Sequence, residues 1–105
     1  MSNKETWKEL RVAERSPVCS TRERGRRFYP ELLAWLRAEA SSSTILSFSG
    51  VDFVSPSFLD ETVVRLAEES PDLARRVTVA SLKPMAARRL KTTLSSMAQA
   101  SPVIV

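Results

Sequence analysis

Apolar residues follow two different periods along this chain, which predicts that strands and helices alternate. A period of two predicts strands over Glu9 to Ala13 and around Val77, Val79 and Leu82, and a short apolar run predicts another over Thr44 to Ser49. Val103 to Val105 is a run of β-branched residues, which favours a final short strand or a docked tail. Three longer segments between these runs have the spacing of amphipathic helices.

The first helical segment begins at a capping signal. Ser20 is followed three residues later by Glu23, which is typical of a capping box, and the apolar face continues to about Glu39. Pro30 falls inside this segment and removes a backbone donor. We therefore expect the helix to kink at Pro30, or to end there and start again.

The other two helical segments begin at prolines, which suit the first turn of a helix. Ser55 is the expected N-cap of a helix over 56–69, and Pro71 is expected to close it. The third helix is predicted to run from Pro84 to about Ala98. Strands that alternate with helices in this order predict an α/β fold, in which the helices cover one or both faces of a sheet.

Composition restricts the size and class of the protein. The 105 residues suit one domain over 1–105, and 43% hydrophobic with 27% charged residues is typical of a soluble globular protein rather than a disordered one. No run is long and apolar enough for a membrane helix, and the first residues lack the apolar core of a signal peptide. We expect a bacterial cytoplasmic protein that makes no membrane contact and is a monomer or a homodimer.

The residue types of this chain disfavour several common kinds of catalytic and binding site. The chain has no histidine, a single Cys19 and two glycines, which argues against common catalytic triads, Cys/His zinc sites and glycine-rich phosphate loops. Asp60 and Glu61 are neighbours on a predicted helix and point about 100° apart, so they cannot converge on one bond. We expect a protein that is not an enzyme and binds no cofactor and no metal.

A net charge of +4 with a pI of about 9.8 suggests an acidic partner without naming one. The basic residues gather in two clusters, the first at Arg22, Arg24, Arg26 and Arg27 and the second at Arg88, Arg89 and Lys91. Three interpretations of these clusters remain open: solvated helix faces, phosphate contacts to nucleic acid, or steering of an acidic protein surface toward the first cluster.

Three motifs occur in order along the chain: Arg22-Glu-Arg-Gly25, the strand from Thr44 to Ser49, and Ser57-Phe-Leu-Asp-Glu61. Together they resemble a family of STAS-like domains of unknown function, and the resemblance covers roughly residues 20 to 82. This family is related to STAS domains, the fold of bacterial anti-sigma-factor antagonists. The resemblance implies a mixed sheet of about four strands packed against about three helices.

The resemblance also implies how such a domain works. In STAS domains a serine in an Asp-Ser-Ser-Gly turn is phosphorylated by a partner kinase, and Ser57 falls in register with it, although Ser55-Pro-Ser57-Phe58 lacks the leading Asp and the trailing Gly. The implied partner is an ATP-binding kinase-like or anti-sigma protein, which exchanges with others when Ser57 is modified. This mode of regulation is called partner switching.

The predicted contact surface is the turn and helix start from Ser55 to Glu61. Each residue also has a structural interpretation: Ser55 and Ser57 can be helix caps, and Asp60 and Glu61 can be partners of the helix dipole. Phe58 is either core or an exposed anchor, and helical spacing predicts that Phe58 and Leu59 cannot both point inward. The alternative function is that of a small basic nucleic-acid-binding protein. The predicted partner-binding residues are Ser55, Ser57, Phe58, Asp60, Glu61 and Arg22.

Overall fold

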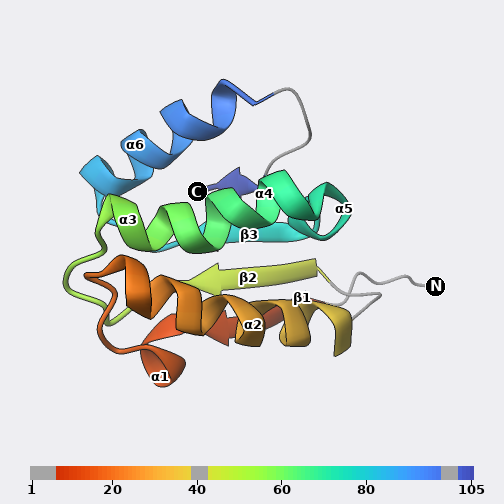
Figure 1. The fold of residues 1–105 in the computed structure, drawn as a ribbon, viewed down its shortest axis with the longest axis horizontal. Helices are drawn as coiled ribbons and strands as arrows, with labels where there is room; N and C mark the ends of the chain where they lie inside the picture. The colour runs from red at the N-terminus through yellow and green to blue at the C-terminus, as the bar shows by residue number, and fades with distance from the viewer. Residues whose placement is uncertain (1–6, 39–42, 98–101) are drawn as a thin grey trace.

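Four strands form one sheet in the order β1-β2-β3-β4, and each strand is parallel to the next one along the chain (Figure 1). The computed structural model describes residues 7–38, 43–97 and 102–105. The predicted α/β architecture is confirmed, but the prediction of a mixed sheet is wrong. Each connection between strands is a crossover that contains a helix, and such a crossover returns the chain in the same direction. The strands are β1 (Trp7–Arg11), β2 (Ser43–Ser47), β3 (Val77–Ala80) and β4 (Val103–Ile104).

Three long helices correspond to the three that were predicted, and two single-turn helices were not predicted. α3, η1 and α4 are successive parts of one continuous helix, and η1 is its π-helical middle. The single-turn helices α1 and α5 follow β1 and α4. The helices are α1 (Val12–Arg15), α2 (Arg22–Ala38), α3 (Pro56–Leu59), η1 (Asp60–Val64), α4 (Arg65–Glu69), α5 (Pro71–Ala74) and α6 (Pro84–Ser95).

The first helix differs from its prediction in two ways. Pro30 lies inside α2, which continues through it without ending and restarting. The proline ring is exposed, whereas the residues around it, such as Phe28 and Leu32, are buried, so tertiary packing outweighs the lost backbone hydrogen bond. The capping residue is Thr21 rather than Ser20, because the Thr21 Oγ1 accepts a hydrogen bond of 3.1 Å from the Arg24 N–H.

Most predicted boundaries differ by a few residues. The first strand starts at Trp7 and ends before Ala13, which belongs to α1, and β2 ends at Ser47. Pro71 starts α5 and thereby confirms the end of the preceding helix at Glu69. The predicted ends of the first and third helices, Glu39 and Ala98, lie outside the described residues.

The long helices lie side by side over the sheet (Figure 1). α2 contacts α3 and η1, and α6 contacts the same helix from its other side. The core fills the space between this helical layer and the sheet, where Leu10, Leu46 and Val79 are buried. The helix that starts at Pro56 is therefore enclosed by α2, by α6 and by the sheet.

Candidate functional site

A short backbone pairing brings the starts of α2 and α3 together. Cys19 forms an isolated parallel bridge with Val54, and the Ser55 N–H donates to the Cys19 carbonyl oxygen over 3.0 Å. Cys19 is buried, which raises the pKa of its thiol to about 11, so the thiol stays protonated at neutral pH. This pairing places the first turn of α2 next to the first turn of α3.

Ser55 has the predicted role of a helix cap. Its Oγ accepts a hydrogen bond of 3.0 Å from the Phe58 N–H, and Pro56 follows at the first helical position. Ser55 is also buried, so its hydroxyl faces the helix and not the solvent. Its structural role is to fix the direction in which α3 leaves the sheet.

Phe58 belongs to the core, and its prediction as an exposed partner anchor is wrong. Its side chain is 0% exposed and lies 6.1 Å from the Phe28 ring and 6.5 Å from the Phe48 ring, measured between centroids. Leu59 is only 3% exposed, so both neighbours are buried. The prediction that they could not both point inward assumed one covered face, whereas this helix is covered by α2 on one side and by α6 on the other.

Arg22 connects the remaining predicted residues. Its Nη1 donates to the Glu61 Oε2 over 2.8 Å, and its Nη2 lies 3.5 Å from the Ser57 Oγ and 3.7 Å from the Asp60 Oδ2. One guanidinium from α2 thus contacts two carboxylates and one hydroxyl from the neighbouring helix. The hydrogen bond to Glu61 raises the pKa of Arg22, so this charge is permanent.

Glu61 is the most enclosed of these charged groups, with a side chain that is 17% exposed. Besides Arg22, it lies 3.8 Å from the Arg26 Nε and 3.8 Å from the Arg65 Nη1. The hydrogen bond from Arg22 and the charges of the three arginines lower the pKa of the Glu61 carboxyl. Its carboxylate is therefore held ionised between two helices.

Gly25 allows these two helices to approach closely. A Cβ atom at this position would lie 2.9 Å from the Glu61 Cβ and 3.0 Å from the Phe58 carbonyl oxygen. The two outer motifs of the resemblance therefore meet in the structure: Arg22 and Gly25 on α2 dock against Phe58 and Glu61. Most of the motif has a structural purpose, and Ser57 and Asp60 are its members nearer the solvent.

We predict that Glu61 contributes to the acid sensitivity of the fold. Because its pKa is lower in the folded protein than in the unfolded chain, protonation favours unfolding, and the stabilisation is lost as pH falls through the folded pKa. Urea midpoints measured from about pH 7 down to about pH 3 should fall less for Glu61→Gln than for wild type. Glu68→Gln is the control, because Glu68 is exposed and has no ion pair with the described residues. Equal pH dependence in Glu61→Gln and wild type would contradict this role.

The two basic clusters differ in how their charges are balanced. In the first cluster, Arg22, Arg26 and Arg27 each have a carboxylate partner within α2 or η1. In the second, none of the bases on α6 forms an ion pair with the part of the chain that the structure describes, and α6 contains no acidic residue. Arg24 is the member of the first cluster that has no ion pair with the described residues. The unbalanced bases of the second cluster are Arg88, Arg89 and Lys91, and Lys83, the N-cap residue of α6, is unbalanced as well.

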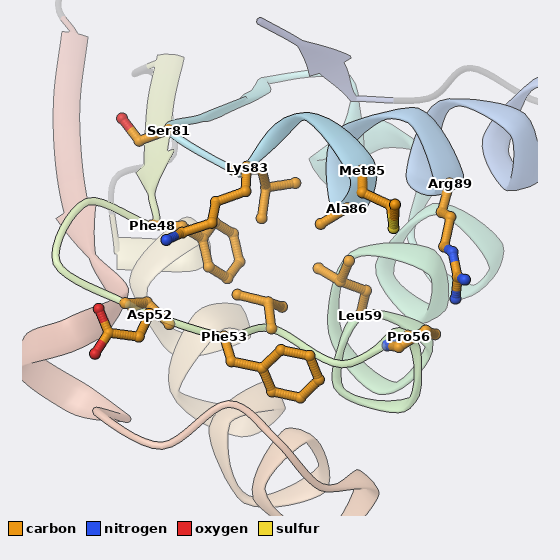
Figure 2. Close-up of a pocket in the computed structure, with 13 residues that line it drawn as sticks. Phe48, Asp52, Phe53, Pro56, Leu59, Ser81, Lys83, Met85, Ala86 and Arg89 are labelled. Carbon is orange, nitrogen blue, oxygen red and sulfur yellow. The ribbon is translucent and has the colours of Figure 1, made fainter.

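The sequence did not reveal an apolar groove beside α3. It has a volume of about 330 Å³ and lies between the loop that precedes α3 and the start of α6. Phe53 and Met85, which flank it, are 61% and 66% exposed (Figure 2). They are far apart in the sequence, and they flank the same groove because β2 and β3 are parallel and end at the same edge of the sheet. The only signal in the sequence was Phe53 in a loop otherwise rich in polar and small residues.

Other kinds of site were also sought. Within residues 7–38, 43–97 and 102–105, no group of three or more potential metal ligands comes together. Among the same residues, no helix is both long and apolar enough to cross a membrane.

The comparisons with known proteins agree with the motifs. A family model described as a STAS-like domain of unknown function matches residues 24–87, which is more than half of the chain. No curated protein and no solved structure shows a significant match. The matched span includes Gly25 and the whole Ser57 to Glu61 motif, and it starts two residues after Arg22. The chain therefore belongs to the family of STAS-like domains of unknown function.

Proposed function

We propose that this domain is a non-enzymatic regulatory module, and that it binds a protein partner at the start of α3. The observation that supports this most is the position of Ser57. Its side chain is partly exposed in the first turn of a helix, and its Oγ lies 3.5 Å from the Arg22 guanidinium. Asp60 is exposed beside it, and η1 forms a π-helical turn, a feature often found at functional sites.

Phosphorylation of Ser57 is the switch that we propose for this surface. A kinase would transfer the γ-phosphoryl group of ATP to the Ser57 Oγ, with loss of the hydroxyl proton and release of ADP. The new group carries a charge of about −1.5 to −2 and would compete with Glu61 for Arg22. Asp60 and Glu61 would repel it at the same time. A partner that docks on the neutral hydroxyl would then meet a changed charge and a disturbed ion pair.

The partner that we propose is an ATP-binding kinase-like or anti-sigma protein, in the cytoplasm of a bacterium. The resemblance to anti-sigma-factor antagonists supports this class, because their partners both dock on and phosphorylate the serine that corresponds to Ser57. The domain would alternate between a bound state with a free hydroxyl and a released state with a phosphoserine.

Ser57→Asp tests this proposal in the full chain. Affinity purification from the native host should recover an ATPase-like partner with wild type, and roughly tenfold less of it with Ser57→Asp, because the new carboxylate lies at the docking surface. Ser95→Asp introduces the same charge at an exposed serine at the end of α6, away from the start of α3, and should retain the partner. Mass spectrometry of the Ser57 peptide shows whether it is phosphorylated. Recovery of the same proteins with all three baits would contradict the proposal.

A further inference from the structure

We infer that the groove between the loop before α3 and the start of α6 binds an acidic protein segment that inserts one apolar side chain. The inference rests on the proposed function, because it assumes that the domain binds a protein. To the proposed function it adds the chemical character of the partner segment, acidic with one apolar side chain, and a second contact surface on the domain. Since this surface is separate from Ser57, the two proposals can fail independently.

The groove is lined mainly by apolar side chains. Its floor includes Phe48 and Leu59, which belong to the core, and Phe53 and Met85 project at its opening (Figure 2). Large apolar side chains at such a position are exposed to water unless a ligand covers them. The volume of about 330 Å³ is at the lower end of the range for binding pockets and suits a single large side chain with its backbone.

The charges around the groove indicate which segment would bind. Lys83 and Arg89 lie toward opposite ends of the opening, and the Asp52 carboxylate points away from it (Figure 2). Neither Lys83 nor Arg89 has an ion-pair partner among the described residues, in contrast to the arginines around Glu61. A partner carboxylate would therefore not have to displace an existing ion pair.

The spacing of the two cations fits an extended segment. Arg89 lies six positions after Lys83 in the sequence, which corresponds to roughly 9 Å along a helix axis. An extended chain covers that distance in about three residues. Two carboxylates could then reach the two cations while an apolar side chain between them enters the groove. Nucleic acid would satisfy the cations with phosphates and could stack a base on Phe53, so it is the alternative that the test has to separate.

Selection from a random peptide library on phage provides a test that assumes no partner. We expect wild-type protein to enrich peptides in which Asp or Glu lies on both sides of a large apolar residue. A fluorescein-labelled oligothymidylate is the probe for the nucleic-acid alternative. Absence of enriched peptides, enrichment of basic peptides, or binding of the oligothymidylate without any acidic peptide would overturn the inference.

The enriched peptide, labelled with fluorescein, then locates the site by fluorescence polarisation. Arg89→Glu and Phe53→Ser should each weaken its binding by roughly tenfold or more, because one removes the cation and the other the apolar rim. Arg88→Glu makes the same charge change on the exposed side of α6, outside the groove, and should weaken binding by less than about threefold. Val103→Ser removes an exposed apolar side chain on β4, outside the groove, and should leave peptide binding unchanged. Urea unfolding confirms that each variant is folded.

The pattern of losses separates the two proposals. Equal losses of peptide affinity in Arg88→Glu and Arg89→Glu would indicate attraction by net charge alone and would overturn the inference that the peptide binds in the groove. Unchanged peptide affinity in Phe53→Ser would also overturn it. Loss of the native partner in Ser57→Asp, together with a groove that binds no peptide, would overturn the inference and leave the proposed function standing. A peptide bound in the groove, with the same host proteins retained by Ser57→Asp, would support the groove and contradict the switch.

Discussion

Phe58→Ala is expected to lower the free energy of unfolding by about 3–5 kcal/mol, which is the usual cost of truncating a buried phenylalanine. The side chain is 0% exposed and contacts two other rings, Phe28 from α2 and Phe48 from the end of β2. Alanine would leave a cavity at the junction of two helices and the sheet. Domains of this size have a total stability of about 5–15 kcal/mol, so the variant is expected to be marginal.

Phe53→Ala is the matched control for this experiment, because the same truncation is made at a ring that is 61% exposed. Urea denaturation followed by circular dichroism should show a large shift of the midpoint for Phe58→Ala and almost none for Phe53→Ala. Similar midpoints for both variants would mean that Phe58 is not a core residue, and would restore it as a candidate contact residue.

Gly25→Leu is expected to destabilise the fold by about 2–3 kcal/mol, in the upper part of the range for overpacked sites. Any Cβ at this position meets the Glu61 Cβ at 2.9 Å and the Phe58 carbonyl oxygen at 3.0 Å, and neither atom is the mobile end of a side chain. The two helices would have to separate, which would also lengthen the Arg22–Glu61 hydrogen bond. This cost exceeds the gain of about 1 kcal/mol from replacing a glycine inside a helix.

Ala34→Leu makes a comparable enlargement at an exposed position in the same helix and should have little effect. The measurement is again the urea midpoint, with Gly25→Ala as an intermediate variant. A stabilised Gly25→Ala would contradict the close approach, because it would show helix propensity acting without a clash.

The order of elements could be predicted from the sequence because the period of its apolar residues changes at turn signals. Ser55 followed by Pro56 located the start of α3, and Pro71 located the end of α4. The alternative in which the first helix ends and restarts at Pro30 was wrong for a physical reason: local propensity is weaker than the burial of the residues on either side of the proline. The helix in each connection favours parallel strands, so strand direction could have been predicted from the sequence; the mixed sheet came from the resemblance.

The candidate site was only partly predictable. Arg22, Ser57, Asp60 and Glu61 could be grouped through the resemblance, and they do come together. The burial of Phe58 could not be foreseen, since it depends on a second helix that packs on the opposite side of α3. The groove depends on two loops that come together only when the sheet forms.

The parallel order β1-β2-β3-β4 has a consequence for how the chain folds during synthesis. Each strand pairs with the one that precedes it, so the sheet can grow at one edge as the ribosome releases the chain. The first pairing, β1 with β2, closes a long crossover without an existing sheet to add to, so we expect it to be the slow step. β3 and α6 would then be added afterwards. On this order, the groove beside Phe53 would form late, after the ion-paired helices have docked.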